Sequence, residues 1–286
     1  MDRFEGKVAV ITGAGSGFGR AFAMKGAALG MKLVLADVDA AALAATLDAV
    51  RAAGGAAIGV ATDVSDGAQV DALARASLDA FGSVHLLFNN AGVGAGGFVW
   101  ENSANDWQWV FGVNVMGVAN GLRAFVPVML AQNEPAHIVN TASVAGLLAA
   151  PAMGVYNASK HAVVALTETL YHDLRLAGAS SIGVSLLCPA FVPTGIADAE
   201  RSRPGALAND APYTASQKLA ARQLTRAVEG GKLSAGDIAE LTFDAVREGR
   251  FYVITHPAIM ASVQLRLDDI AQLRNPTDPM SLKRPR

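Results

Sequence analysis

A tyrosine and a lysine four residues apart, Tyr156 and Lys160, are the side chains of this sequence best suited to moving a proton. Because a spacing of four places two residues on one face of a helix, we expect them to lie side by side. A free tyrosine titrates near ~10, too high for a base at neutral pH. An ammonium about 5 Å away, at an effective dielectric constant of about 20, would favour the tyrosinate by about 3 kcal/mol. Tyr156 is therefore predicted to exchange a proton with a substrate hydroxyl or carbonyl at about pH 7.

A serine thirteen residues earlier, Ser143, comes just after the apolar run 137–141. If that run is a strand, Ser143 emerges at the carboxyl edge of a sheet, beside the helix that begins at Tyr156. A hydroxyl there can hydrogen-bond a developing alkoxide. Taken without its neighbours, Ser143 would equally be a simple turn residue.

A glycine-rich loop with the sequence T-G-A-G-S-G-F-G follows the first apolar run, 7–12, and opens the next helix. Glycines there allow positive φ and bring backbone N–H groups to a pyrophosphate at the positive end of the helix dipole. A tight turn without a ligand is the alternative, because such a loop alone is weak evidence. The candidate dinucleotide contacts are Gly13, Gly15, Ser16, Gly17, Phe18 and Gly19.

An aspartate 18 residues beyond Gly19, Asp37, ends the second apolar run, with Val38 after it. A carboxylate at this point can accept hydrogen bonds from an adenosine ribose, and it would repel a 2′-phosphate. No Arg or Lys stands at Gly15 or Val38, so NAD is predicted over NADP. Capping of the next helix is the alternative role, and Asp39 could fill that role equally well.

After the third apolar run, Asp63 and Val64 are candidates for the adenine edge of the cofactor. A helix-capping role for Asp63 or Ser65 is an equally good interpretation. The single cysteine, Cys188, lies in an apolar run and is interpreted as a buried, inert thiol.

Short apolar runs alternate with segments of helical period along the chain. Strands are predicted at 7–12, 32–36, 56–61, 84–88, 137–141, 182–188 and 251–254, and helices at 17–30, 40–53, 67–81, 105–131, 156–177 and 236–248. Continuous apolar strands separated by helices indicate a parallel sheet covered on both faces. The prediction is an α/β, Rossmann-like, doubly wound sheet of about seven strands in one domain, 1–286. A loop-rich excursion at 190–235 and a partly helical extension at 256–286 interrupt or follow this alternation.

Composition excludes several classes of protein. The 286 residues are 52% hydrophobic and 17% charged, which excludes disorder. A net charge of −2 without a basic stripe argues against nucleic-acid binding, and the cluster Lys283, Arg284 and Arg286 is interpreted as a solvated terminus. One cysteine, no apolar leader and no apolar stretch near ~18–20 residues predict a cytoplasmic protein without a membrane segment. The five histidines show no metal-ligand spacing, so no metal is expected.

Four motifs in order along the chain resemble the short-chain dehydrogenase/reductase family over roughly residues 4–255. The matching residues are Thr12, Gly13, Gly17 and Gly19 of the glycine-rich loop, the run Asn89-Asn90-Ala91-Gly92, and the tetrad Asn114, Ser143, Tyr156 and Lys160.

The resemblance implies a role for each member of the tetrad. Tyr156 would be the general acid/base, with Ser143 positioning the substrate oxygen. Lys160 would hold the nicotinamide ribose and lower the pKa of Tyr156. Asn114 would support a water in a proton relay, and Asn90 would stabilise the fourth strand and its cofactor contacts.

The resemblance is weaker after the sixth strand, where the P-G of the family is Pro189-Ala190 in this chain. Thr194 matches the hydroxyl that contacts the nicotinamide carboxamide. The remaining cofactor contacts implied are Ala91, Gly92, Pro189 and Val192.

The function expected from these residues is NAD-dependent interconversion of a secondary alcohol and a ketone. An apolar or aromatic substrate is predicted from the candidate pocket residues Gly94, Val144, Gly146, Leu147, Met153 and Phe191, together with the excursion from Ala190 to Ser234. Arg201 and Arg203 could instead provide a site for an acidic group. A non-catalytic dinucleotide sensor or scaffold, and a Rossmann-like methyltransferase, are the alternatives.

The family usually forms dimers or tetramers through two long helices, here 105–131 and 156–177. A homo-oligomer is therefore expected. The extension 256–286 would line a neighbour's pocket or cap the fold.

Overall fold

Seven parallel strands form the centre of the structure, a computed structural model that describes residues 1, 3–279 and 281. Their order is β3-β2-β1-β4-β5-β6-β7, and every neighbouring pair is parallel. The strands are β1 Val8–Thr12, β2 Lys32–Asp37, β3 Ala57–Ala61, β4 Leu86–Asn89, β5 Ala136–Thr141, β6 Ile182–Cys188 and β7 Tyr252–Ile254. The predicted doubly wound sheet is confirmed. That the whole chain is one domain stays a prediction.

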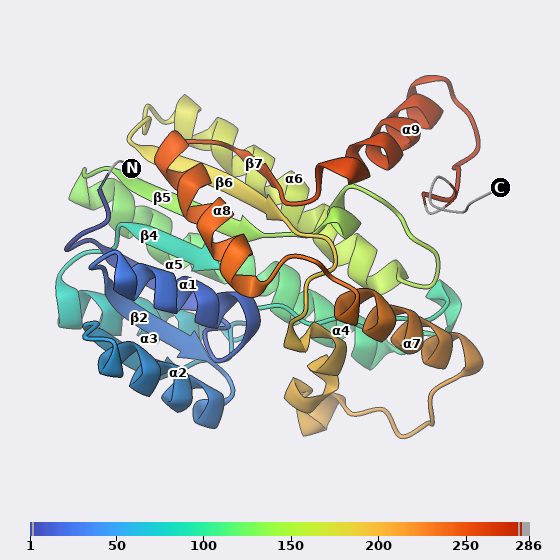
Figure 1. Ribbon diagram of the computed structural model, residues 1–286, viewed down its shortest axis with the longest axis horizontal. Coiled ribbons are helices and arrows are strands. Elements are labelled where there is room, and N and C mark those ends of the chain that lie inside the picture. Colours follow the sequence, from blue (N-terminus) through green and yellow to red (C-terminus); the bar gives the residue numbers. More distant parts are fainter. Residues whose placement is uncertain (2, 280, 282–286) are drawn as a thin grey trace.

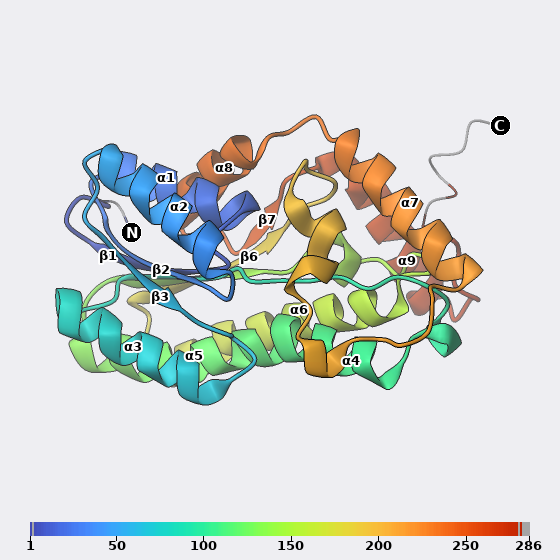
Figure 2. The same cartoon turned by 90° about the horizontal axis from the view of Figure 1, so that it is seen from below.

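Helices cover both faces of the sheet, as the continuous apolar strands require (Figure 2). On one face lie α1 Gly17–Ala28, α2 Ala40–Ala52 and α8 Ala235–Glu248; on the other lie α3 Gly67–Phe81, α4 Ala104–Phe111, α5 Gly117–Gln132 and α6 Gly154–Leu176. Phe22 and Phe88 stack with ring centres 4.6 Å apart in the first core. Phe125 and Met129 are buried in the second.

The chain changes direction across the sheet at β1, which pairs with β2 on one side and β4 on the other. The loops after the neighbouring strands β1 and β4 therefore diverge at the carboxyl edge and leave a crevice, the usual ligand position in such sheets. The predicted site residues end or follow the strands β1 to β6, apart from Asn114 in the helical stretch after β4 and Tyr156 and Lys160 in α6.

The predicted helix 105–131 is interrupted. A π-helical turn, Gly112–Met116, separates α4 from α5 and contains Asn114. Such a turn widens the helix by one residue and is frequent at functional sites. Here it directs the buried Asn114 side chain toward α6 and the loop after β4.

The stretch Ala104–Gln132 is long and apolar enough, by length and composition alone, to cross a membrane. This corrects the expectation that no segment of the chain passes that test. The stretch is apolar because its side chains belong to the core: Val118, Phe125 and Met129 are buried against the sheet. A core helix of this kind has the same composition as a membrane span.

The excursion after β6 contains more helix than predicted. It includes the 3-10 segments Gly195–Ser202 and Gly205–Leu207 and the helix α7 Ala215–Glu229. Thr214 and Gln217 form a reciprocal capping box at the start of α7. This pattern indicates a helix start, but the nearby prolines and mixed charges favoured the prediction of a loop.

The C-terminal extension is partly helical, as predicted, with α9 at Met260–Ala271. Helices α7 and α9 both lie beyond the carboxyl edge of the sheet (Figure 1). The basic cluster 283–286 is outside the described residues.

Candidate functional site

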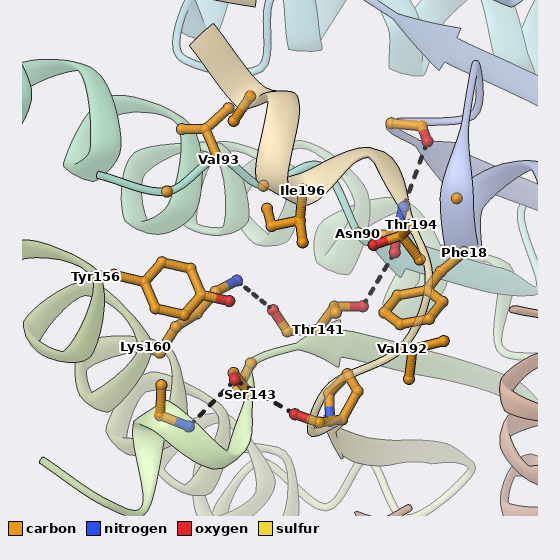
Figure 3. A pocket seen from close by; sticks show the side chains of 18 of the residues that line it. Phe18, Asn90, Val93, Thr141, Ser143, Tyr156, Lys160, Val192, Thr194 and Ile196 are labelled. Atoms are coloured by element: carbon orange, nitrogen blue, oxygen red, sulfur yellow. Dashed lines mark hydrogen bonds between the residues drawn. The ribbon is translucent and has the colours of Figure 1, made fainter. Parts of the chain in front are cut away.

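A cavity of about 280 Å³ opens at the carboxyl edge of the sheet. Figure 3 shows side chains from several elements converging on it. Of the predicted site residues, those lining it are Gly13, Ser16, Gly17, Phe18, Asp37, Val38, Val64, Asn90, Ala91, Gly92, Ser143, Tyr156, Lys160, Pro189, Val192 and Thr194. Gly15, Gly19, Asp63 and Asn114 are absent from the lining. Loops spread from Gly13 to Thr194 along the sequence therefore meet at one cavity.

Tyr156 and Lys160 lie one turn apart on α6 and both point into the cavity (Figure 3). The Lys160 ammonium lies 5.7 Å from the centre of the Tyr156 ring. It is held there by donating a hydrogen bond to the Thr141 carbonyl at 3.0 Å. Burial lowers the pKa of Lys160 to about 8.

The pKa of Tyr156 is raised, because burial desolvates the phenolate, and a hydrogen bond with Ser143 acts in the opposite direction without cancelling this effect. The expectation that Lys160 brings this pKa down toward neutrality is therefore wrong for the protein by itself. The lysine is engaged with the Thr141 carbonyl, and the tyrosine has lost its hydration.

Ser143 has the turn role considered for it, and its contact with a substrate oxygen stays a prediction. Its hydroxyl accepts a hydrogen bond from the Ala145 N–H at 3.1 Å, which caps the short 3-10 turn Val144–Gly146. The same hydroxyl donates to the Pro189 carbonyl at 3.3 Å and is hydrogen-bonded to Tyr156. The turn places this hydroxyl beside the tyrosine.

Asn114 lies beneath the cavity. Its amide oxygen accepts from the Val93 N–H, and its NH₂ donates to the Val93 carbonyl and the Ser159 hydroxyl, each at 2.9 Å. These contacts join the loop after β4 to α6. A Cβ at Gly92 would lie 3.4 Å from both the Asn114 oxygen and the Lys160 nitrogen. That is ordinary van der Waals contact, and the predicted water relay stays a prediction.

The glycine-rich loop fits a dinucleotide pyrophosphate. Gly13 and Gly17 have φ of +65° and +51°, and a Cβ at Gly19 would lie 2.0 Å from the Gly13 carbonyl. Ser16 is the N-cap of α1, yet its side chain makes no capping hydrogen bond. The first N–H groups of α1 are thus left without a side-chain cap beside the cavity, where an anion can accept from them.

Asp37 holds this loop to the end of β2. One carboxylate oxygen accepts from the Gly15 N–H at 2.8 Å and the other from the Asp39 N–H at 2.9 Å. Asp39, not Asp37, caps α2 by accepting from the N–H groups of Ala41 and Ala42. The capping alternative for Asp37 is excluded, and its carboxylate lines the cavity.

After β3, the helix α3 is capped by Asp66, so neither Asp63 nor Ser65 has the capping role considered for it. Asp63 accepts from the N–H and hydroxyl of Ser65 at 2.9 and 2.7 Å. Val64 reaches the cavity, whereas Asp63 does not.

Thr12 is a positioning residue that the site prediction missed, although it belongs to the glycine motif. Its hydroxyl accepts from the N–H groups of Asn90 and Ala91, at 2.9 and 3.1 Å, and donates to the Phe88 carbonyl. The Asn90 amide returns a hydrogen bond to the Thr12 carbonyl at 2.9 Å. The loops after β1 and β4 are therefore tied together.

Another part of the cavity wall comes from the excursion after β6, as predicted, and from the C-terminal extension, whose position the sequence left open. Its residues are Ile196, Ala199 and Arg201 after β6, Leu224 and Val228 of α7, and Ile259 and Pro279 of the C-terminal extension. A hydrogen bond from the Ser262 hydroxyl to the Pro279 carbonyl, at 2.9 Å, holds Pro279 near the cavity. The extension thus covers this chain's own cavity.

Among the predicted pocket residues, Gly94, Val144, Met153 and Phe191 line the cavity, while Gly146 and Leu147 do not. Among residues 1, 3–279 and 281, no cluster of three or more His, Cys, Asp or Glu could hold a metal.

Arg203 is unavailable to an acidic substrate. Its guanidinium is buried in ion pairs with Asp106 at 2.8 Å and Glu200 at 2.6 Å, and it lies 4.1 Å from the Trp109 ring centre. This arrangement fixes the segment after β6 against α4.

Comparison with known proteins agrees with this geometry. Residues 7–205 match the family model described as short chain dehydrogenase. The crystal structure of a short-chain dehydrogenase/reductase from Burkholderia phymatum in complex with NAD superposes with a TM-score of 0.97 at 74% identity, covering 98% of this chain and 100% of that one. A CLA biosynthesis dehydrogenase/reductase from Lactiplantibacillus plantarum is 35% identical over 94% of this chain and 95% of its own length.

A 1-deoxy-11-beta-hydroxypentalenate dehydrogenase from Streptomyces exfoliatus is 32% identical over 92% of this chain and 88% of its own length. Matches of this extent, together with the cradle and the tetrad, determine the family. The chain belongs to the short-chain dehydrogenase/reductase family and is an NAD(P)-dependent oxidoreductase acting on CH–OH groups.

Proposed function

We propose that the protein interconverts a secondary alcohol and a ketone, with Tyr156 as the general acid/base and NAD as the preferred cofactor. The observation that carries this proposal is the convergence of Ser143, Tyr156 and Lys160 on one cavity beside the glycine-rich cradle. A nicotinamide in that cavity supplies or accepts the hydride.

In ketone reduction, the Tyr156 hydroxyl donates its proton to the substrate oxygen. The Ser143 hydroxyl turns from the Pro189 carbonyl to donate to the same oxygen, where negative charge develops. In alcohol oxidation the phenolate of Tyr156 accepts the proton instead. Lys160 lies near the ring, and its ammonium favours the phenolate at pH values below its own pKa of about 8.

The preference for NAD rests on Asp37. Its carboxylate lies in the cavity and binds the Gly15 N–H, so a 2′-phosphate at this point would meet a negative charge. The Burkholderia phymatum structure, which contains NAD, supports the same assignment.

An apolar secondary alcohol is the proposed substrate class. The lining contributed by Val144, Leu148, Met153, Ile196 and Ile259 is apolar, and Arg203 is already paired. The name of one relative, 1-deoxy-11-beta-hydroxypentalenate dehydrogenase, describes a substrate that has a hydroxyl group.

The test is oxidation of a panel of secondary alcohols, from 2-butanol to 2-decanol and 1-phenylethanol, with NAD⁺ or NADP⁺. The expected result is a kcat/KM that rises with apolar surface and is higher with NAD⁺. Higher kcat/KM for hydroxy acids or sugars, or for NADP⁺, would contradict these assignments.

We also propose that the protein is cytoplasmic and forms a dimer or tetramer. Exposed apolar side chains at Met116 and Leu130, on the helical stretch expected at the subunit contact, support an oligomer. Light scattering of the purified protein measures the mass against 29.4 kDa for one chain.

A further inference from the structure

Arg201 is a cationic side chain at the cavity that forms no ion pair within the described residues. It belongs to the 3-10 segment Gly195–Ser202, is exposed, and lines the cavity together with the glycine-rich loop. Its guanidinium donates to the Ser16 hydroxyl at 3.3 Å. Within the described residues no carboxylate forms an ion pair with it, unlike Arg203 two positions later.

The segment carrying Arg201 crosses the phosphate-binding loop at two points. Thr194 lies against Gly17, where a Cβ would be 3.3 Å from the threonine Cβ. Arg201 reaches the adjacent Ser16. The guanidinium therefore stands beside the N-terminus of α1, whose partial positive charge it would repel in the absence of an anion.

We propose that Arg201 is a phosphate ligand of the bound dinucleotide, donating to the pyrophosphate alongside the N-terminus of α1. A guanidinium and a helix N-terminus that adjoin one cavity repel each other, and an anion bound to both removes this repulsion. The pyrophosphate is favoured over a 2′-phosphate because the Asp37 carboxylate occupies the ribose end of the loop. The proposal does not depend on which alcohol the enzyme oxidises.

A consequence concerns the order of binding. Ile196 and Ala199 belong to the same short segment as Arg201 and line the substrate end of the cavity. A pyrophosphate bound to Arg201 holds this segment in place, so the dinucleotide completes the substrate wall. Cofactor is then expected to bind first.

The test is fluorescence titration of NADH into wild type, Arg201→Ala, Arg201→Lys and Arg222→Ala. Arg222 is an exposed arginine on α7 that does not line the cavity, so its loss removes the same charge from the same excursion. Arg201→Ala is expected to raise the Kd for NADH roughly 5- to 30-fold, with partial recovery in Arg201→Lys. Arg222→Ala should stay within about twofold of wild type.

An unchanged Kd for NADH in Arg201→Ala overturns the proposal. If only NADPH binding were weakened, the guanidinium would serve a 2′-phosphate, and the pyrophosphate assignment would be wrong. Hydrogen exchange over residues 194–207 reports the consequence: NADH should slow exchange in wild type and have a smaller effect in Arg201→Ala. If NADH slowed hydrogen exchange equally in wild type and Arg201→Ala, Arg201 would not couple cofactor binding to this segment. Because these readouts need no substrate turnover, they are separate from the test of the proposed reaction.

Discussion

The proposed proton transfer involves two neighbouring side chains, Tyr156 and Lys160, whose pKa values are shifted in opposite directions by burial. Burial raises the pKa of Tyr156 and lowers the pKa of Lys160 to about 8. The tyrosine is thus ready to donate a proton at neutral pH and is a poor acceptor there. This favours ketone reduction near neutrality and alcohol oxidation in alkaline solution.

The pH dependence of the two directions follows from this assignment. For oxidation, the active phenolate becomes more abundant as pH rises, so kcat/KM should increase without a plateau between about pH 6.5 and 9.5. For reduction, Tyr156 is fully protonated at low pH. The rate of reduction should therefore be independent of pH there and decline only in alkaline solution. Initial rates in both directions at saturating cofactor measure this. A plateau for oxidation already at neutral pH would show that Tyr156 titrates far lower than its burial indicates.

At the scale of elements, the π turn between α4 and α5 directs Asn114 away from the usual course of a helix. The side chain then satisfies both the N–H and the carbonyl of Val93 and holds Ser159 of α6. Asn114→Leu is expected to leave these buried groups unpaired and to lower the free energy of unfolding by about 2 kcal/mol or more. It should also lower kcat more than it raises the Kd for NADH, because Asn114 does not line the cavity. Denaturant unfolding and NADH titration check this; a fall in affinity alone would contradict it.

The buried pair Arg203–Asp106 anchors the excursion to α4. The two side chains are 6% and 3% exposed, and burial alone would raise the pKa of Asp106, yet hydrogen bonds from Ser103, Asn209 and Arg203 hold it below its usual value. Arg203→Met leaves that carboxylate buried without its cation, at an expected cost of about 3 kcal/mol in the free energy of unfolding.

The matched control is Arg247→Met, which removes one partner of the exposed pair with Asp244. Its expected effect is below about 1 kcal/mol. Urea unfolding of both variants gives the comparison, and equal effects would show that the buried pair does not stabilise the fold. The double variant Arg203→Met/Asp106→Asn should recover part of the loss, because the unpaired charge is then gone.

Over the whole molecule, local sequence patterns are sufficient to predict the sheet and the loops that follow its strands. Apolar runs predict strands directly, and positions such as Gly13 and Tyr156 follow from short spacings. The return of Pro279 to the cavity could not be predicted, since it depends on a hydrogen bond from Ser262, seventeen residues away, rather than on a motif. The pKa of Tyr156 was predicted in the wrong direction because spacing reveals the nearby lysine and says nothing of desolvation.

The reaction proposed for this molecule is tested most directly by comparing wild type with Tyr156→Phe. The variant keeps the ring beside Lys160 and removes only the hydroxyl, so NADH should bind within about twofold of wild type. Turnover of a secondary alcohol should fall by about a thousandfold or more, since no other described group in the cavity replaces this proton donor. Retention of wild-type turnover by Tyr156→Phe would contradict the assignment of Tyr156 as the general acid/base.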